Sequence, residues 1–573
     1  MTRPVLTPVL GAALTLLSLA ACGGGGADAL PVLSAAQAAP LSQCSVLLTS
    51  FAFPGTQITA AEAVAAGTLS NAGQPVAAHC RITGKMNERV SAVDGQTYAI
   101  GFEMRLPNDW RGRFLYQANG GTDGAVSTAT GAFSGGGPLQ HGLQLGFAVL
   151  SSDAGHSSAQ NPMFGLDPQA RLDYGYQAVG TLTPMAKALI RAAYGKGPDR
   201  SYIGGTSNGG RHTLVAATRY PEQYDGYLAT SPGFNLPKAA VAQLYGAQQW
   251  ASVATSTGTA PNFDLESALP ATERTLLSQA ILARCDALDG LADGLVQDGG
   301  ACRSAFDLQR DVPTCSGARD GSCLSAAQKT AIANVYTGAR NSAGQALYSG
   351  WAYDPGLSST GWADWKFRNS VRGGRDPVAV AFIFSSPPAS TTPLASTLAY
   401  ALNYNFDTDA PLIHATSGVY TESAMSFMTP RDPANLDAVR NRGAKVLVIH
   451  GNADPVFSVD DTTRWYDSVN ARYQGAASDA VRFFRVPGMG HSRGGPATDQ
   501  FDGLTALVDW VEKGIAPDRI VATARGAGNA GGVNSEVPST WSASRSRPLC
   551  PYPTVTRYKS GDVEQASSFA CER

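Results

Sequence analysis

Short apolar runs and one long helical pattern alternate along the first part of the chain. Residues 98–106, 113–117, 147–150 and 200–204 are short and mostly apolar, which predicts strands. Between the last two runs, apolar side chains recur at helical spacing: Val179, Leu182, Ala186, Leu189, Ile190 and Ala193. Because strands and helices alternate, the pattern predicts an α/β fold with a parallel, doubly wound sheet.

The pattern is lost between about residues 234 and 430 and then returns. In this stretch strands are hard to find, and Gly, Ser, Pro and Trp are scattered through irregular segments such as 358–365. Buried strands are predicted again at 444–450 and 481–486. The apolar positions of the helix that follows are Leu504, Leu507, Val508 and Val511.

Because the core pattern resumes after this interruption, we interpret residues 233–430 as a lid domain inserted into one core domain. The core domain then comprises residues 42–232 and 431–573. Such a lid would cover the carboxyl ends of the strands, where ligands bind in α/β sheets. The alternative is a separate downstream domain. The length of 573 residues agrees with more than one globular unit.

The first residues predict an exported protein. Arg3 precedes an apolar run that is too short to span a bilayer, so residues 1–21 are predicted to be a signal peptide. The ending Leu-Ala-Ala-Cys resembles a bacterial lipobox, which implies lipidation of Cys22 and a glycine-rich, flexible tether over residues 22–41. We therefore expect a lipid-anchored envelope protein of the periplasm or outer membrane, with ordinary secretion as the alternative.

Charge and cysteine content restrict the partners and the compartment. Charged residues make up 15% of the chain, against about 25% in an average domain, and the formal net charge is −2. There is thus no electrostatic case for nucleic acid as a partner. Eight cysteines remain besides Cys22: Cys44, Cys80, Cys285, Cys302, Cys315, Cys323, Cys550 and Cys571. Spacing does not establish their connectivity, but disulfides between sequence neighbours are the simplest arrangement in an exported protein.

Residues 205–209 carry the first indication of catalytic chemistry. They read Gly-Thr-Ser-Asn-Gly and lie between the predicted strand at 200–204 and a predicted helix. A G-x-S-x-G motif in this position is typical of the sharp turn that exposes a nucleophilic serine, here Ser207. Glycines flank the serine because strand and helix leave little room for Cβ atoms. The alternative is an ordinary glycine-rich loop. His212 follows closely, but its helical position should point it away from Ser207.

A second glycine-rich loop, at 119–124, follows the predicted strand at 113–117. In an α/β-hydrolase, such a loop supplies one backbone N–H of the oxyanion hole, and the residue after the nucleophile supplies the other. We therefore expect Gly120, Gly121 and Asn208 to provide donors for a developing oxyanion. The alternative is a plain turn.

The order nucleophile, acid, histidine leads from the serine to Asp454 and His491. Both follow the ends of predicted strands, and of the seven histidines only His491 lies downstream of Asp454. His491 would accept the serine proton, and Asp454 would orient the imidazole. Asp460 and Asp461 are rival acids, but their position is typical of a helix N-terminus, where carboxylates suit the helix dipole.

Together these motifs resemble the tannase and feruloyl esterase family. The matching segments are 119–121, 205–211, Asp454, 487–491 and 507–517, within a similarity that covers roughly residues 42–573. The resemblance implies an α/β-hydrolase fold with a large inserted lid. It also implies a serine esterase that cleaves small esters of aromatic acids, of feruloyl, galloyl or terephthalate monoester type, through an acyl-enzyme. The four local cysteine pairs fit the family's peripheral disulfides.

Two other functions use the same features. One is an esterase for aliphatic or polyester-oligomer esters on the same scaffold. The other is a lipid-anchored protein that binds polyphenols or carbohydrates without catalysis. The aromatic residues that could contact a substrate from the lid are Trp362, Trp365, Phe382 and Phe384, although aromatic side chains are more often part of a core.

The chain departs from the family at the two catalytic loops. Many members have cysteines directly before the nucleophile and directly after the histidine, joined in a disulfide. Here these positions are Thr206 and Ser492, so this disulfide cannot form. Because Ser207 and His491 must meet, we expect Thr206 and Ser492 to lie near each other.

An acidic segment at 285–295 lies within the predicted lid. Its carboxylates and glycines suit a hard cation that prefers several oxygen ligands, although the spacing is not that of an EF-hand. The segment resembles the family's lid calcium loop. That resemblance implies a structural Ca²⁺ held by three side chains and two carbonyls, those of Asp286, Asp289, Asp293, Leu291 and Leu295. A solvated acidic turn is the alternative.

Overall fold

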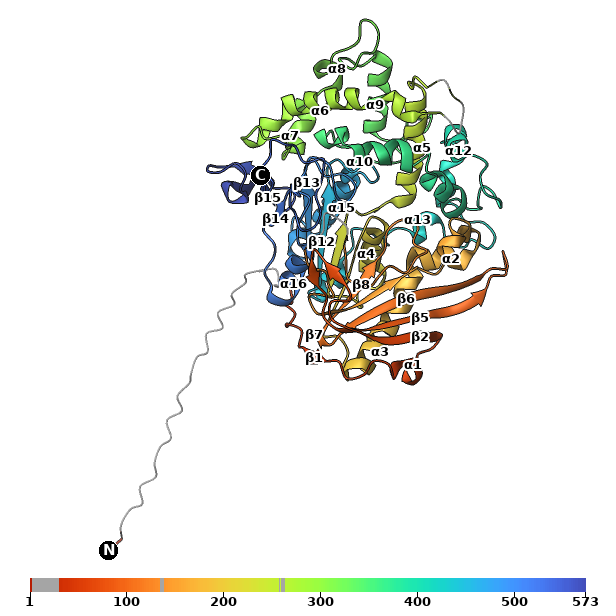
Figure 1. Ribbon diagram of the computed structural model, residues 1–573, viewed down its shortest axis with the longest axis vertical. Helices are drawn as coiled ribbons and strands as arrows, with labels where there is room; N and C mark the ends of the chain where they lie inside the picture. Colours follow the sequence, from red (N-terminus) through yellow and green to blue (C-terminus); the bar gives the residue numbers. More distant parts are fainter. Residues whose placement is uncertain (3–29, 134–138, 257, 259–262) are drawn as a thin grey trace.

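A nine-stranded sheet forms the centre of the computed structural model, which describes residues 1–2, 30–133, 139–256, 258 and 263–573 (Figure 1). The strand order is β13-β12-β11-β10-β8-β9-β6-β5-β2. The bounds are β2 (Thr56–Val64), β5 (His79–Val90), β6 (Thr97–Pro107), β8 (Arg113–Ala118), β9 (Phe147–Ser152), β10 (Arg200–Thr206), β11 (Gly226–Thr230), β12 (Lys445–Gly451) and β13 (Val481–Val486). Short two-stranded pairs lie outside it: β1 (Ala39–Pro40) with β7 (Asp109–Trp110), β3 (Ser70–Asn71) with β4 (Gln74–Pro75), β14 (Ile520–Thr523) with β15 (Ser546–Leu549), and β16 (Val555–Tyr558) with β17 (Phe569–Glu572).

The sheet is mixed, whereas the sequence pattern predicted a parallel one. Strands β13, β12, β11, β10, β8 and β9 run parallel to one another, and β6, β5 and β2 continue the sheet with antiparallel pairings that begin between β9 and β6. The connection from β5 to β6 contains no helix. A connection that short joins antiparallel strands, whereas parallel strands need a long crossover.

Different helices cover the two faces of the parallel strands. One face packs against α3 (Ala178–Tyr194), α4 (Asn208–Arg219) and α15 (Val459–Arg472), and the other against α16 (Gly503–Lys513). Strand β12 shows the alternation directly: Val446 and Val448 belong to the first core, while Leu447 and Ile449 belong to the second. The remaining short helices outside the lid are α1 (Leu47–Ser50), α2 (Pro168–Leu172) and α14 (Asp437–Asn441).

The lid is inserted between two strands that are neighbours in the sheet, β11 and β12. It is helical: α5 (Leu236–Ala251), α6 (Ala271–Cys285), α7 (Gly299–Ala305), α8 (Leu308–Asp311), α9 (Ala326–Thr337), α10 (Thr360–Ala363), α11 (Arg375–Val378), α12 (Thr397–Asn403) and α13 (Ala424–Phe427). Figure 1 shows these helices in green and cyan above the sheet. Their apolar core is continuous with core-domain residues such as Tyr174 and Phe457. The lid therefore packs tightly onto the core domain.

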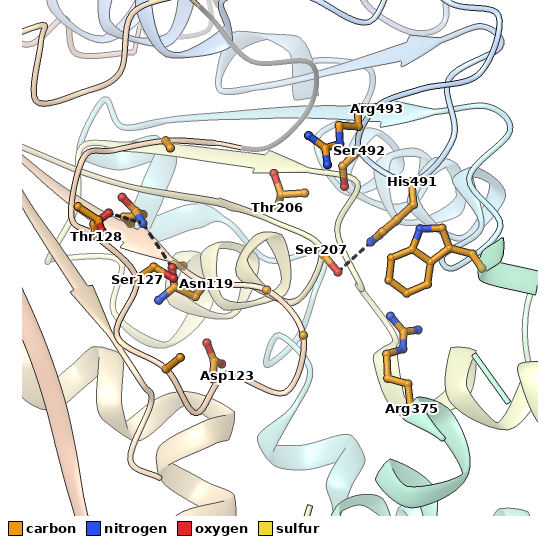
Figure 2. Close-up of a pocket in the computed structure, with 17 residues that line it drawn as sticks. Asn119, Asp123, Ser127, Thr128, Thr206, Ser207, Arg375, His491, Ser492 and Arg493 are labelled. Carbon is orange, nitrogen blue, oxygen red and sulfur yellow. Dashed lines mark hydrogen bonds between the residues drawn. The ribbon is translucent and has the colours of Figure 1, made fainter. Parts of the chain in front are cut away.

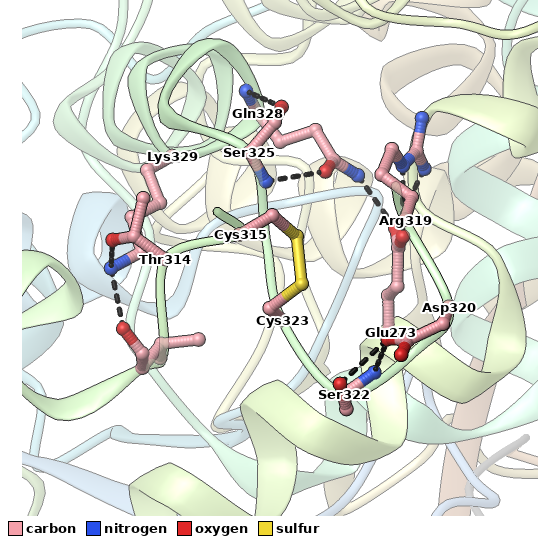
Figure 3. Close-up of a disulfide and its surroundings, with 11 residues drawn as sticks. Glu273, Thr314, Cys315, Arg319, Asp320, Ser322, Cys323, Ser325, Gln328 and Lys329 are labelled. Carbon is pink, nitrogen blue, oxygen red and sulfur yellow. Dashed lines mark hydrogen bonds and ion pairs between the residues drawn. A yellow bond between two sulfur atoms is a disulfide. The ribbon is translucent and has the colours of Figure 1, made fainter. Parts of the chain in front are cut away.

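All four pairs of neighbouring cysteines are disulfide-bonded: Cys44–Cys80, Cys285–Cys302, Cys315–Cys323 and Cys550–Cys571. Figure 3 shows the bond between Cys315 and Cys323, in the lid. Within the loop that it closes, Arg319 forms an ion pair of 2.7 Å with the buried Glu273 of α6. The disulfide and the ion pair together hold this loop on the lid helices.

The amino-terminal predictions fall partly outside the described residues, as does Cys22. The end of the predicted tether is not flexible but packs on the core domain. The Ala36 and Gln37 N–H groups donate to the carboxylates of Glu512 (3.1 Å) and Asp199 (2.7 Å), and β1 pairs with β7. Within the described part of the chain, no helix is long and apolar enough to cross a membrane.

Candidate active site

Ser207 occupies the sharp turn between β10 and α4, with φ 63° and ψ −121°. The flanking glycines are required because the end of β8 lies against the turn. A Cβ added to Gly205 or Gly209 would lie 2.3 or 2.2 Å from the carbonyl oxygen of Ala118. Side chains at these positions would collide with backbone, so the turn depends on the two glycines.

Three side chains from three strand ends meet at this turn, and Figure 2 shows two of them, Ser207 and His491. The Oγ atom of Ser207 lies 2.9 Å from Nε2 of His491, and Nδ1 of His491 lies 2.8 Å from Oδ2 of Asp454. Asp454 follows β12, and His491 follows β13. If Nδ1 donates to the aspartate, Nε2 is left to accept the hydroxyl proton. The arrangement is that of a nucleophile, a base and an orienting acid.

The carboxyl group of Asp454 is fully buried and well supplied with donors. The N–H groups of Val456 and Phe457 donate to Oδ1 at 2.8 and 3.1 Å, and His450 Nε2 lies 3.2 Å from Oδ2. Burial opposes ionisation, but the charge of His491 and hydrogen bonds from both histidines outweigh it, so the pKa of Asp454 lies well below its usual range. Asp454 is therefore ionised at neutral pH.

The rival acids have other partners. Asp460 forms an ion pair with Arg303 (2.7 Å), and Asp461 accepts two hydrogen bonds from the Asn235 amide (2.9 and 3.1 Å). Both lie in the first turn of α15, as the sequence pattern indicated. His212 lies 2.9 Å from Asp123 and not beside Ser207.

The predicted oxyanion donors lie beside the nucleophile. A Cβ on Gly120 would be 3.8 Å from Cβ of Ser207. Within the described part of the chain, the N–H groups of Gly120 and Gly121 donate to no protein acceptor. Asn208 is the first residue of α4, so its N–H has no intrahelical acceptor. Three backbone donors are thus available next to the serine.

A cavity of about 630 Å³ opens onto Ser207 and His491. One wall is polar and comes from residues 117–132, including Asn119, Ser127 and Thr128. The lid contributes Trp365 and Arg375 to the lining, and Figure 2 shows Arg375 across the cavity from Asn119 and Thr128. The indole packs edge-on against the His491 ring at 5.2 Å between centroids, and the Arg375 guanidinium lies 4.9 Å from the indole centre.

The family described as "Tannase and feruloyl esterase" matches residues 80–572, most of the chain. This chain belongs to the tannase and feruloyl esterase family. The chain is 39% identical over 546 residues to mono(2-hydroxyethyl) terephthalate hydrolase of Piscinibacter sakaiensis, covering 90% of this chain and 88% of that protein. It is 28% identical over 507 residues to a probable feruloyl esterase B of Emericella nidulans, covering 82% and 83%.

Solved structures of the family share the fold. Feruloyl esterase B from Aspergillus oryzae superposes with a TM-score of 0.68 at 22% identity, covering 92% of this chain and all of that one. Tannin acyl hydrolase from Aspergillus niger gives a TM-score of 0.66 at 20% identity, covering 91% and 93%. The predicted α/β-hydrolase fold with a lid is thereby confirmed.

The two positions that are cysteines in many members of the family both line the cavity in this chain. Thr206 and Ser492 face it from the two catalytic loops (Figure 2). The N–H of Ser492 donates to Oγ of Ser231 at 3.2 Å, while its own buried hydroxyl has no hydrogen-bond partner among the described residues. The His491 loop is therefore held by its backbone and by packing rather than by a disulfide.

Of the four lid aromatics singled out from the sequence, Trp365 lines the main cavity. Trp362 and Phe382 belong to the lid core. Phe384 lies in the same core but also borders a small cavity of about 20 Å³ beside Ser207 and Asn208. The other aromatic ring that packs against His491, Phe457, comes from the core domain, at 5.5 Å.

The three aspartates of the predicted calcium loop come together beside the carboxy-terminal segment. Burial, with Asp293 and Asp286 nearby, raises the pKa of Asp289 to about 7, and its Oδ2 atom is buried without a hydrogen-bond partner. Asp293 instead forms an ion pair with Arg547. Asp286 accepts hydrogen bonds from the Asp293 and Gly294 N–H groups. Among the described residues, no three acidic, His or Cys side chains are arranged as a metal site.

Sequence reasoning missed several residues of the site. Arg375 lies in an irregular part of the lid with no motif around it, although Gly373 and Gly374 precede it. Nothing local indicates that it reaches the catalytic serine. His450 is the last-but-one residue of β12, four residues before Asp454, and this proximity was the available indication.

Proposed function

We propose that this protein is a serine carboxylic ester hydrolase that acts on esters of aromatic acids through an acyl-enzyme intermediate. The observation that carries the proposal is the position of His491, within hydrogen-bond distance of both Ser207 and Asp454. The names of the relatives, a terephthalate monoester hydrolase and a probable feruloyl esterase, support an ester as the substrate.

The geometry supports the following sequence of steps. His491 Nε2 takes the hydroxyl proton while Oγ of Ser207 attacks the ester carbonyl carbon. The oxyanion receives hydrogen bonds from the Asn208 N–H and from the N–H groups of the Gly120–Gly121 turn. When the intermediate collapses, the alcohol leaves with the proton from His491. Water, deprotonated by the same histidine, then releases the acid and restores Ser207.

The lid wall favours an aromatic acid with a second, negatively charged group. Trp365 presents a flat apolar surface at the catalytic histidine, and Arg375 places a guanidinium beside it. Within the described residues, Arg375 has one carboxylate partner, Asp376, at 3.2 Å. A guanidinium binds a further carboxylate well because its N–H groups match the two oxygens. We therefore place a terephthalate monoester first, before feruloyl and galloyl esters.

We expect Arg375→Gln to discriminate between substrates. For mono(2-hydroxyethyl) terephthalate, kcat/KM should fall about 10- to 100-fold, since a charge-assisted hydrogen bond contributes about 1.5–3 kcal/mol. For methyl ferulate and methyl gallate, which lack that carboxylate, it should stay within about threefold. Steady-state kinetics on the three esters test this.

Arg493→Gln is the matched control. Arg493 lines the same cavity and carries the same charge. Its side chain is exposed, and it lies two residues after His491. This substitution should change kcat/KM for all three esters by about the same factor. An equal loss on all three esters in Arg375→Gln would show that the arginine is not the carboxylate partner. Faster turnover of aliphatic or polyester-oligomer esters would favour that alternative, and no turnover of any ester would favour a binding protein.

We also propose a structural Ca²⁺ in the lid, held by Asp286, Asp289 and Asp293 with the carbonyls of Leu291 and Leu295. The unpartnered Oδ2 of Asp289 and the raised pKa of its carboxyl group support a cation at this position. Calcium would supply positive charge and oxygen coordination there. Two features argue against it: the ion pair between Asp293 and Arg547, and the lack, among the described residues, of three acidic, His or Cys side chains grouped as in a metal site.

Calcium should therefore raise the melting temperature. A ligand at 100 times its Kd stabilises the folded state by about 2.7 kcal/mol, which corresponds to several degrees at most for a protein of this size. Thermal melts with calcium and with EDTA, together with metal analysis, measure the effect. Asp289→Asn should abolish it. Equal melting temperatures with calcium and with EDTA, together with no bound metal, would show that the loop is a solvated acidic turn.

We further propose that the protein is exported and lipid-anchored through Cys22. The four disulfides support an oxidising compartment, because structural disulfides are rare in a reducing cytosol.

A further inference from the structure

The buried carboxyl group of Asp123 connects the two loops that carry the oxyanion donors. Asp123 lies on the glycine loop after β8, and its side chain is 2% exposed. Its Oδ2 atom accepts a hydrogen bond from Nδ2 of Asn208 at 2.8 Å and lies 2.9 Å from Nε2 of His212. Both partners belong to α4, the helix that begins immediately after Ser207.

The backbone of Asp123 also shapes the glycine loop. Its N–H donates to the carbonyl oxygen of Gly120 at 3.3 Å, which closes a turn around Gly121. The residue adopts φ 54°, in the left-handed region where Asp and Asn are tolerated better than most residues. One residue therefore closes the turn that presents Gly120 and Gly121, and holds the helix end that presents the Asn208 N–H.

The network continues in a closed path back to the same loop. Oδ1 of Asn208 accepts from Nε of Arg211 at 2.6 Å, so both ends of the Asn208 amide are engaged. Arg211 donates to the carbonyl of Tyr174 at 2.9 Å, and the Tyr174 hydroxyl donates to the carbonyl of Gly121 at 3.3 Å. The side chain of Asn208 thus has a single orientation, fixed from both sides.

We infer that Asp123 is a positioning residue for the oxyanion hole: by clamping Asn208 to the Gly120–Gly121 turn, it sets the distance between the two groups of backbone donors. Donors of this kind act only when they are held where the oxyanion develops. Asp123 touches neither the serine nor the histidine, so it acts through Asn208. This inference rests on the proposed serine mechanism.

The protein retains this carboxyl group despite an unfavourable environment. Burial raises the pKa of Asp123 to about 7, even though Asn208 and nearby positive groups counteract it. The titratable and charged groups that face it are Tyr116, Asp153, His156, Tyr174, Arg211 and His212. A carboxyl group whose pKa is raised on folding destabilises the folded state progressively as pH rises from about 4 to 7. A residue kept only for stability would not be expected here.

Asp123→Asn tests the inference, because Asn tolerates the same backbone conformation, while its neutral amide oxygen is a weaker acceptor for Asn208 than a carboxylate and its NH₂ group replaces the second carboxylate oxygen. We expect kcat on a p-nitrophenyl ester to fall about 10- to 100-fold, with KM within about twofold. This loss is smaller than the one expected when an oxyanion donor is removed altogether. The Ki of benzeneboronic acid, which forms a tetrahedral adduct with a serine, should rise by a similar factor. The melting temperature at pH 8 should not fall, because a buried charge has been removed.

Asp173→Asn is the matched control. Asp173 is also buried with a pKa raised to about 7, but it accepts a hydrogen bond from the Gln169 side chain (2.9 Å) and does not bind an oxyanion loop. It should keep wild-type kcat and boronate affinity. If Asp123→Asn does not fold, Asn208→Ala gives the same readouts while keeping the backbone N–H. The double variant should be no slower than the slower single variant, because both remove the same clamp.

The outcomes separate this inference from the proposed function. Activity in Ser207→Ala would overturn the serine mechanism and the inference with it. If Ser207→Ala is inactive but Asp123→Asn keeps kcat within about twofold, only the inference fails. A fall in kcat with unchanged boronate affinity would also overturn it, because the loss would then lie outside the oxyanion hole.

Discussion

Ser207→Ala is expected to lower kcat on any ester substrate by about 10⁴- to 10⁶-fold, because it removes the hydroxyl group that His491 Nε2 can deprotonate at 2.9 Å. His491→Ala should lower it by a similar factor, and the double variant should be no slower than either single one. Residues of a catalytic unit behave in this non-additive way. Steady-state kinetics with a p-nitrophenyl ester, with circular dichroism as the folding control, measure the effect.

A pre-steady-state burst of p-nitrophenol in the wild type should accompany this result. The burst reports acyl-enzyme that forms faster than it is hydrolysed, and it should be absent in Ser207→Ala. Substantial residual turnover in the alanine variant would contradict the assignment of the nucleophile.

Asp454→Asn is expected to lower kcat about 10³- to 10⁴-fold without unfolding the protein. The N–H groups of Val456 and Phe457 donate to Oδ1, so an asparagine would keep its amide oxygen there. Its NH₂ group would then face Nδ1 of His491 and force that nitrogen to accept. Nε2 would carry the proton and could no longer accept one from Ser207. The pH dependence of kcat/KM, measured beside the wild type, tests this.

Asp461→Asn is the control for the acid. Asp461 is also buried, in the first turn of α15, and burial raises its pKa to about 6. It is engaged by Asn235 and should tolerate the change with kcat within about threefold. Near-wild-type activity of Asp454→Asn, together with loss in Asp461→Asn, would show that the acid was misassigned.

Some of the fold was predictable and some was not. The predicted strands at 98–106, 113–117 and 444–450 correspond to β6, β8 and β12, since compact apolar runs are typical of buried strands. Strands β2, β5 and β11 were missed. β11 is only five residues long and begins with Gly226, and β2 has much of its length exposed. Their apolar pattern in the sequence is therefore weak, and they form strands because they pair with adjacent strands of the sheet.

The sequence by itself determined the parts of the site that depend on local sterics and chain order. Only glycine fits at 205 and 209, because a Cβ there would collide with the Ala118 backbone. The motif around Ser207 can therefore be recognised from the sequence alone. Asp454 and His491 follow the ends of β12 and β13, and the carboxyl ends of neighbouring parallel strands meet at one edge of the sheet.

Only the tertiary structure decided which distant side chains complete that site. Arg375 and Trp365 reach the cavity because the long helical segment between β11 and β12 packs back over the sheet. Asp123 acquires its role by meeting Asn208, 85 residues away. Such contacts depend on how whole elements pack rather than on neighbouring residues, so no local pattern contains them.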